Sequence, residues 1–514
     1  MVLSIAEAFA TSFFPTQYAY HIGAAIVAIL VFRAFSQGRK TNRERDLHAR
    51  TILVTGGFTP LGLTLLKSLA ERGAHIIALS PDPIESPKVT ILIDLLRTTT
   101  SNEEIYAEEC DLTKPGSIRS FCTKFLTEKE QRLDAIIFGH EHQHIGSPKR
   151  FSSSTHKEDQ KARDAGSLAS FLITTLLLPA LLVAPVERDI RIINVVNPFY
   201  AAAAGPAFEA AFSTVEEEQG PRPKSIFLQE GQRALRTIVL TRHLQRVLDA
   251  LPAAQVPKTE EGAKHIPVVN SKHQKSNIVA ISVSPGIGRV DTVSSFLKAD
   301  FMSPQGSYLG LFLYIIGQPL LRIFTKSPFF AMQSILHVLF LPTPFKILAQ
   351  TTFQTTGTDS QKAAQTQGPL DASSLEMPEE ILLPGALYSE CAAVKLKVNI
   401  TQEMRDKDFQ ERKEAALLQE EKKAGKKDKG KGKAKAEPAP LTEDVLDISD
   451  DGEYGGELAG RLVWEAYEDA LKIWEKENPA EVVVEKAEEI PKPQEQLPKA
   501  RPTTAAEEDP DVYR

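Results

Sequence analysis

The chain has few cysteines, few tryptophans and no excess of positive charge. Its 514 residues include three cysteines and two tryptophans, and the formal net charge is −7. Three cysteines without paired spacing exclude a disulfide framework and a zinc site built from thiolates, and they fit a reducing compartment. The acidic balance argues against a general nucleic-acid-binding protein, which would need a basic surface, so we expect no nucleic-acid partner.

Long uncharged runs are also scarce, and the clearest one lies near the N-terminus. Residues 22–32 read IGAAIVAILVF, and with their aromatic flank they extend to an apolar segment at 14–35. That length reaches the roughly 20 residues needed to cross a bilayer. The positive charges follow the run, whereas a cleavable signal would carry them before it, so an uncleaved anchor is favoured. The alternative is a helix that is buried or lies in the membrane interface.

The anchor interpretation also predicts a topology. Basic residues cluster after the apolar segment, between Arg33 and Arg45. Because basic flanks stay in the cytosol, everything after Lys40 is expected there, and residues 1–13 are expected on the other side. The chain would be a single-pass membrane protein of the endoplasmic reticulum rather than of the mitochondrial outer membrane.

Short apolar runs alternate with helical patterns over residues 50–290. The runs expected to be strands are 51–55, 75–80, 105–113, 133–139, 190–196 and 277–286. Helical apolar spacing is found between them, most clearly at 61–73, 115–128, 167–182 and 229–251. This alternation predicts an α/β fold with a doubly wound, Rossmann-like parallel sheet that helices cover on both faces.

The remaining chain divides by composition. We expect an apolar helical region facing core or membrane, a flexible loop, a last globular part, a charged linker, a docked amphipathic helix and a disordered tail. These segments are, in order, 291–350, 351–374, 375–402, 403–456, 457–477 and 478–514.

A glycine-rich stretch follows the first strand: residues 54–62 read VTGGFTPLG. Gly56 and Gly57 would form a tight turn, and Gly62 would let the following helix approach the strand closely. The N–H groups at the start of that helix, together with its dipole, could receive a pyrophosphate. Pro60 removes one of these donors, although proline is tolerated in a first helical turn.

Four features in order, at 55–62, 110–113, 133–139 and 282–288, make the chain resemble the short-chain dehydrogenase/reductase superfamily. The anchored form with its lysine-rich linker also looks like a degenerate, membrane-anchored fungal branch of unknown function. The resemblance implies NAD or NADP as cofactor, held by the glycine loop, with Asp111 near the adenine. Ser80 stands where NAD-binding members carry an acid for the ribose. The alternative is a loop kept for its turn alone, with no cofactor.

The family reduces carbonyls with a tyrosine and a lysine four residues later, which share one helix face. No tyrosine of this chain has lysine four residues after it. Alignment puts Leu228 and Gln232 in these two places, and a shift of two residues gives Glu230 and Ala234. We therefore expect no catalytic tyrosine–lysine pair.

The other catalytic positions also differ from the family. The serine after the fifth strand becomes Val196 or Asn197, and the asparagine before the long helix falls near Gly166. The family motif Asn-Asn-Ala-Gly is replaced by residues 138–141, which read FGHE. The site is thus expected to be degenerate.

Two substitutes remain open. His140, His142 and His144 alternate along the chain and could bind zinc or copper, although a histidine-bearing loop at the strand edge is the simpler interpretation and no metal is expected. Tyr200 could approach a nicotinamide from an unusual direction, but packing under its loop is favoured because no cation is placed to lower its pKa.

The sequence therefore predicts a membrane-anchored protein with a non-catalytic, dinucleotide-sensing or scaffold role, with a membrane, lipid or protein partner. One alternative is an NAD(P)-dependent oxidoreductase that acts on a lipid carbonyl with unconventional residues. Another is an adaptor that recruits a partner through its C-terminal extension.

Overall fold

The structure is a computed structural model of the chain and describes most residues between 19 and 479. The described ranges are 19–127, 132–143, 145–148, 151, 156–185, 188–204, 208–212, 225–251, 277–299, 306–343, 380–402, 404–406, 409–410, 413 and 450–479. The predictions for segment 1–13, for loop 351–374, for most of linker 403–456 and for nearly all of tail 478–514 fall outside these ranges.

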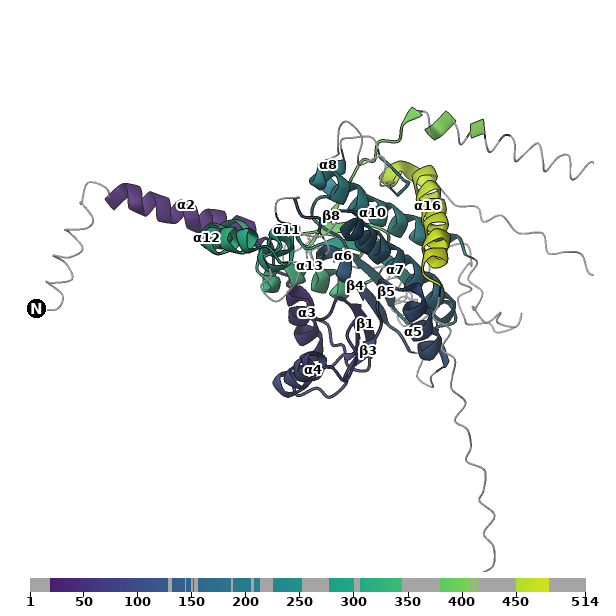
Figure 1. Cartoon of the computed structure of the whole chain (residues 1–514), viewed down its shortest axis with the longest axis horizontal. Helices are drawn as coiled ribbons and strands as arrows, with labels where there is room; N and C mark the ends of the chain where they lie inside the picture. Colours follow the sequence, from purple (N-terminus) through teal and green to yellow (C-terminus); the bar gives the residue numbers. More distant parts are fainter. Residues whose placement is uncertain are drawn as a thin grey trace, which may run out of the picture. The chain divides into compact units, whose positions relative to one another are not determined.

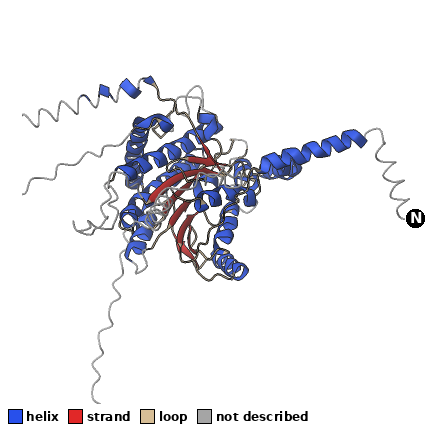
Figure 2. Ribbon diagram, turned by 180° about the vertical axis from the view of Figure 1, so that it is seen from behind, coloured by secondary structure: helices blue, strands red, loops and turns tan. Residues whose placement is uncertain are grey.

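In the described part of the chain, the strands form one central sheet with helices around it (Figure 2). The sheet has eight strands in the order β3-β2-β1-β4-β5-β6-β7-β8. The strands are β1 (Thr51–Thr55), β2 (His75–Ser80), β3 (Ile105–Glu109), β4 (Ala135–Phe138), β5 (Ile190–Val195), β6 (Ile278–Ser284), β7 (Leu387–Ser389) and β8 (Ala392–Val394). The doubly wound sheet and the six predicted strands are confirmed. The six predicted strands pair in parallel, as expected, and β7 and β8 extend the sheet beyond the predicted range, with β8 antiparallel to β7.

The strands send alternate side chains into two cores, one on each face of the sheet. Ile52 and Val54 belong to one core and Leu53 to the other, as the two-residue period of a strand requires. The first face is covered by α3 (Pro60–Ala70), α4 (Pro87–Thr100) and α13 (Pro328–Phe340). The second is covered by α5 (Pro115–Thr127), α7 (His156–Leu182) and α10 (Ile226–Ala250) (Figure 1).

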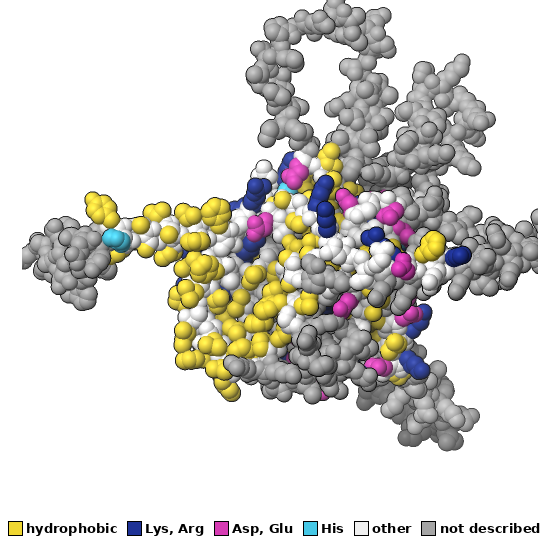
Figure 3. Space-filling view, turned by 90° about the horizontal axis from the view of Figure 1, so that it is seen from above, with side chains coloured by type: hydrophobic (Ala, Val, Ile, Leu, Met, Phe, Trp, Pro, Cys, Tyr) yellow, Lys and Arg dark blue, Asp and Glu magenta, His cyan; other side chains and the backbone are white. Residues whose placement is uncertain are grey.

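Two further apolar helices lie largely outside these cores. α2 (Ala19–Gln37) contains an 18-residue window, Tyr20–Gln37, that is long and apolar enough to cross a membrane and is 0% buried. α12 (Tyr308–Phe324) contacts α2. Figure 3 shows hydrophobic side chains on the projecting α2 and on the adjoining part of the body. A window in α7, Glu158–Leu182, also passes the length and composition test, but it is 67% buried and forms part of the core.

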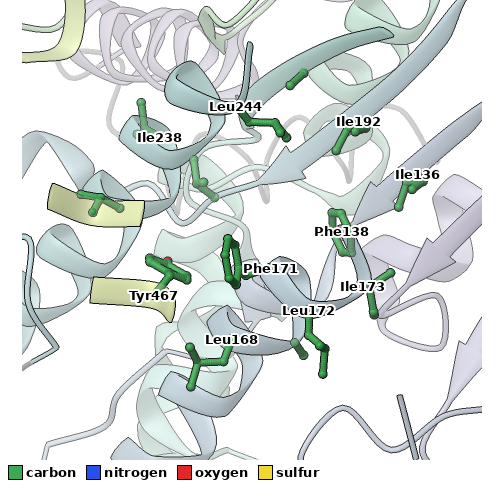
Figure 4. Close-up of a cluster of buried hydrophobic side chains, with 14 of the residues drawn as sticks. Ile136, Phe138, Leu168, Phe171, Leu172, Ile173, Ile192, Ile238, Leu244 and Tyr467 are labelled. Carbon is green, nitrogen blue, oxygen red and sulfur yellow. The ribbon is translucent and has the colours of Figure 1, made fainter. Parts of the chain in front are cut away.

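A C-terminal helix, α16 (Gly456–Glu477), packs on α7 and α10. Its fully buried Tyr467 meets Phe171 of α7 with ring centroids 5.5 Å apart (Figure 4). Trp464 meets the same ring edge-on, with ring centroids 5.1 Å apart. Just before α16, the short η5 (Glu453–Gly455) places Asp451 against Arg246 of α10 and buries Tyr454. The end of the predicted linker is therefore built into the fold.

Candidate functional site

The order of the strands reverses between β1 and β4, because the chain runs outward through β2 and β3 and then returns. In open α/β sheets, ligands bind outside the carboxyl ends of the strands at such a switch point. Four elements follow the carboxyl ends of the central strands: the start of α3 after β1, α6 (His140–Gln143) after β4, α8 (Tyr200–Ala203) after β5 and the π-helical turn η3 (Arg289–Ser294) after β6. Both α3 and α6 contact η3. The candidate site is built from these elements.

The glycine loop after β1 is a tight turn that the first turn of α3 approaches closely. Gly56 has a φ of +67°, and a Cβ atom there would lie 2.8 Å from the backbone N of His140. A Cβ at Gly62 would lie 2.2 Å from the carbonyl oxygen of Gly56 and 2.6 Å from that of Gly57. The first turn of α3 therefore touches the backbone of the loop, and a side chain at position 62 has no room.

The N–H groups of the first turn of α3 already have partners within the chain. Thr59 caps the helix, since its Oγ1 accepts from the Gly62 N–H at 3.0 Å, and Pro60 has no N–H to donate. The Leu61 N–H donates to Oδ1 of Asp291, from η3, at 3.1 Å. Asp291 is 2% exposed, and burial raises the pKa of its carboxyl, although the hydrogen bond from Leu61 acts in the opposite direction.

The chemistry of this donor set does not fit the pyrophosphate of a dinucleotide. A phosphate bound at a helix N-terminus needs free N–H groups and a position open to its negative charge. Here Leu61 and Gly62 donate elsewhere, and a buried carboxylate occupies the acceptor position beside the positive end of the helix dipole. Asp291 thus takes the place at which a phosphate oxygen would be received.

The other two predicted cofactor residues lie at the carboxyl ends of the neighbouring strands. Ser80 ends β2 and is 1% exposed, and its Oγ accepts from the Asp82 N–H at 3.0 Å. Asp111 follows β3, and its Oδ1 accepts from the backbone N–H and the hydroxyl of Thr113 at 2.9 and 2.7 Å. Asp111 therefore stabilises the loop that leads into α5. All five predicted cofactor residues, Gly56, Gly57, Gly62, Ser80 and Asp111, lie at the carboxyl ends of β1, β2 and β3.

His140 fills the space behind the glycine loop. Its Nε2 lies 2.9 Å from the carbonyl oxygen of Gly166 and its Nδ1 lies 2.7 Å from Oγ1 of Thr55. Because a carbonyl oxygen can only accept, Nε2 carries the proton and Nδ1 accepts from the threonine hydroxyl. Burial lowers the pKa of His140, so the ring is neutral and locks α6 between β1 and α7.

The second histidine of the alternating motif is equally enclosed. Burial lowers the pKa of His142 to about 4, and its Nδ1 lies 3.4 Å from the carbonyl oxygen of Val196. His144 falls outside the described residues. Within the described residues, no group of three potential ligands is placed to hold a metal ion.

The four positions that align with the family's catalytic residues have structural contacts. Gly166 accepts from His140, and Gln232 accepts from the Glu209 N–H at 3.3 Å. Leu228 packs against the core on the α7 and α10 face. Asn197 donates through Nδ2 to the carbonyl oxygen of Glu230 at 3.1 Å and to the Glu230 carboxylate at 3.4 Å. The side chain of α10 that reaches Asn197 is therefore Glu230, the residue given by the shifted alignment.

Glu230 is the centre of a buried ionic network. Its carboxylate is 2% exposed and lies 2.7 Å from Nη2 of Arg233 and 3.0 Å from Nε of Arg163. It also accepts from the Gly146 N–H at 2.9 Å. Because a guanidinium stays protonated at any physiological pH, neither arginine can serve as the proton donor that the family's tyrosine provides.

A second buried carboxylate extends this network to α6. Oε1 and Oε2 of Glu141 accept from the hydroxyls of Ser170 and Thr237 at 3.4 and 3.0 Å, and Arg233 donates to the backbone oxygen of Glu141 at 3.3 Å. The network joins α6, α7 and α10, so it fixes these helices relative to one another. Tyr200 begins α8 beside it, half-buried and packed against the adjoining core.

The sequence had pointed to Glu141 and Glu230 but not to Asp291, Arg163 or Arg233. A signal for Arg233 was available, because Glu230, Arg233 and Arg236 recur every three residues, and residues three apart are neighbours on a helix surface. Asp291 gave no such signal, because it meets Leu61 across 230 positions of sequence.

Comparison with known proteins gives a consistent family. A family described as KR domain matches residues 50–144. The chain is 26% identical over 332 residues to an uncharacterized oxidoreductase of Schizosaccharomyces pombe, pbr1. The aligned region covers 64% of this chain and 80% of pbr1. It is 27% identical over 339 residues to an uncharacterized oxidoreductase of Saccharomyces cerevisiae, YNL181W, and the aligned region covers 62% of this chain and 74% of that protein. Human retinol dehydrogenase 12 is 26% identical to the chain over 208 residues, and the aligned region covers 40% of this chain and 60% of the dehydrogenase.

Proposed function

Because the chain belongs to the short-chain dehydrogenase/reductase superfamily, we propose that it is a non-catalytic, membrane-attached member whose dinucleotide site is closed by its own Asp291. Its role is that of a scaffold: the Rossmann-like body presents a fixed surface at a membrane. The resemblance to two fungal oxidoreductases of uncharacterized function is compatible with this role.

The observation that carries the proposal is the hydrogen bond from the Leu61 N–H to the buried carboxylate of Asp291. A nicotinamide dinucleotide would have to displace this carboxylate before its pyrophosphate could approach the start of α3. Two like charges cannot share the position, because each would raise the free energy of the other in a buried site. The chain's own carboxylate therefore competes with the cofactor.

The second argument comes from the reaction itself. Carbonyl reduction needs a proton donor positioned beside the substrate oxygen, which contributes about 10²–10⁴-fold to the rate. The side chain of α10 that contacts Asn197 is Glu230, and its carboxylate is engaged in ion pairs with Arg233 and Arg163. This network supports the packing of α6, α7 and α10 instead of offering a proton.

Membrane attachment is supported by α2 and its basic flank. The exposed 18-residue window of α2 has the composition of a membrane span, and Arg33, Arg39 and Lys40 at its inner end are exposed. This arrangement favours a cytosolic body, and the reducing compartment suggested by three buried free cysteines agrees with it. We place the protein in the endoplasmic reticulum membrane.

The alternative function is an NAD(P)-dependent oxidoreductase that acts on a lipid carbonyl. It is favoured by the name of one relative, a retinol dehydrogenase, and by the glycine loop that the chain retains. In that case η3 must move so that Asp291 leaves α3, and a group outside the family's tyrosine–lysine pair must donate the proton.

Titration of the full-length protein in detergent with NADH and NADPH separates the two functions. The wild type is expected to show no binding, and Asp291→Ala is expected to gain it, because the Leu61 N–H is freed and the competing carboxylate is gone. Asp94→Ala removes an equal charge from the exposed face of α4 and serves as the matched control, which should resemble the wild type.

Binding by the wild type as tight as by Asp291→Ala would contradict closure of the site. Wild-type turnover of a lipid aldehyde or ketone would establish the oxidoreductase instead. We expect no turnover even in Asp291→Ala, because the Glu230 network is unchanged in that variant.

A further inference from the structure

We propose that α12 lies in the interface of the membrane that α2 enters, with its exposed face among the lipid headgroups and upper acyl chains. The bilayer would then hold the body at two helices, one that crosses it and one that lies along it. This inference rests on the membrane attachment proposed above and adds the orientation of the body at the bilayer.

The exposed face of α12 is continuous and apolar. Large hydrophobic side chains that are each more than half exposed recur at the spacing of one helix face: Leu309 (53%), Phe312 (60%), Ile316 (60%) and Leu320 (62%). Among the helix's own residues, only Gly310 is buried. A soluble surface rarely exposes a patch of this kind, which usually marks an interaction site.

The ends of α12 show that it cannot cross the bilayer. At its start, the Ser307 N–H donates to the carbonyl oxygen of Lys298 at 2.8 Å. At its end, Lys326 pairs with the segment just after β6, through Lys326 N–H to Ile287 O at 2.9 Å and Arg289 N–H to Lys326 O at 2.9 Å. Both ends are therefore fixed to the same body, and a helix of 17 residues is shorter than the roughly 20 needed to span.

The inner end of α2 is tied to the end of α12. Ser36 donates through its hydroxyl to the carbonyl oxygen of Ile323, and Gln37 donates to that of Thr325 at 3.3 Å. The rings of Phe32 and Phe324 lie 6.3 Å apart. Because these contacts join the two helices where α2 would leave the membrane, α12 is brought to the level of the interface (Figure 1).

Charge favours a lipid as the occupant of this face. Cations that are exposed border the apolar surface at the inner end of α2 and on α12 itself: Arg33, Arg39, Lys40 and Arg322. Between residues 19 and 45, Glu44 is the single acidic residue. A phospholipid leaflet offers acyl chains to the apolar face and phosphates to the bordering cations, and such flanking cations strengthen binding to anionic leaflets.

A membrane also accounts for α2 and α12 together. The exposed surface of α2 continues into that of α12 through the Phe32–Phe324 contact. A protein partner on α12 alone would leave α2 in water, whereas a bilayer covers both. The exposed face of α12 is therefore covered by the cytosolic leaflet of a bilayer.

Single-cysteine labelling of the full-length protein tests this arrangement, because the three native cysteines are all buried. The variants Phe312→Cys and Ile316→Cys, labelled with an environment-sensitive fluorophore, would be reconstituted into phosphatidylcholine vesicles with and without phosphatidylserine. Both labels are expected to shift their emission to shorter wavelength and to be quenched by lipids that carry a quencher near the headgroup. The shift should be larger with phosphatidylserine. Lys472→Cys on the exposed face of α16 is the matched control and should report water.

A label at Leu30→Cys in α2 separates this inference from the proposed attachment. If Leu30 is quenched from within the bilayer while positions 312 and 316 report water, the anchor stands and the interfacial helix is wrong. If Leu30 itself reports water in vesicles, the anchor fails and α12 loses its premise. The label at position 312 could instead report an apolar environment in the absence of vesicles, and copies of the chain could cross-link there. That result would show that a second copy of this chain covers α12, and it would overturn the inference.

Discussion

α12 and α13 are neighbouring apolar helices with opposite surroundings. They are separated by three residues, 325–327, and each is made mainly of apolar residues. Ten consecutive residues of α13, from Ala331 to Phe340, are buried, whereas α12 exposes a full apolar face. Apolar composition alone therefore does not decide which of the two enters the core.

The two helices differ in the hydrogen-bond partners that the rest of the chain offers them, and α13 has several. Gln333 accepts from the Thr41 N–H at 3.3 Å, and His337 lies 3.2 Å from the hydroxyl of Thr41. Arg191 of β5 donates to the carbonyl oxygens of Val338 and Leu341 at 2.6 Å each. Because unpaired backbone carbonyls are costly to bury, these donors let the end of α13 pack against the sheet. Among the described residues, no comparable group of side chains hydrogen-bonds to the exposed face of α12.

The largest expected effect follows from removing the donor that serves α13. Arg191→Met should lower the free energy of unfolding by about 3–5 kcal/mol, because it leaves two buried carbonyls without a donor and Asp189 without its nearest partner. Arg322→Met on the exposed face of α12 is the matched control and should change it by less than about 0.5 kcal/mol. Chemical denaturation of both variants in detergent measures the difference. Equal losses would show that α12 is as integral to the fold as α13.

A smaller effect is expected from the packing of the two helices. Leu336→Ala in α13, where the side chain is 1% exposed, should cost about 2–5 kcal/mol because it leaves a cavity. Leu320→Ala in α12, where the side chain is 62% exposed, should cost less than about 0.5 kcal/mol. Thermal unfolding in detergent gives both values. A large loss for Leu320→Ala would indicate that protein, and not lipid, covers this face.

Much of the fold could be predicted because its signals are local. Strands such as 190–196 are short runs rich in isoleucine and valine between helical patterns, and the structure confirms this one as β5. β7 and β8 were missed because each has three residues, too few for any period to appear. α7 begins at His156, eleven residues before the predicted helix, because its first turns are polar and lack the apolar spacing.

The site was harder to predict because its contacts are long-range. The glycine loop is read from adjacent residues, and its close approach at Gly62 follows from residue type. The Asp291 contact depends on how η3 folds back after β6, which no spacing encodes. The position of Glu230 beside Asn197 depends on the register of α10 against β5, and the sequence left two registers open.

The smallest expected effect concerns pH, and it again separates α13 from α12. Burial and the nearby Arg43 lower the pKa of His337, while Glu380 acts in the opposite direction. In the unfolded chain a histidine titrates near about 6.5. As the pH falls below that value, His337 becomes protonated in the unfolded state but stays neutral in the folded state. The free energy of unfolding therefore decreases. Above about pH 7 this contribution is constant.

His337→Gln removes the titrating group and can keep a hydrogen bond to Thr41. The fall in stability between about pH 7 and about pH 5 should therefore be shallower in this variant than in the wild type. It should not vanish, because burial also lowers the pKa of His140, His142 and His243. Arg322→Gln in α12 is the control, since arginine does not titrate in this range. Denaturation midpoints at the two pH values give the slopes, and an unchanged slope in His337→Gln would mean that α13 opens to water before His337 is protonated.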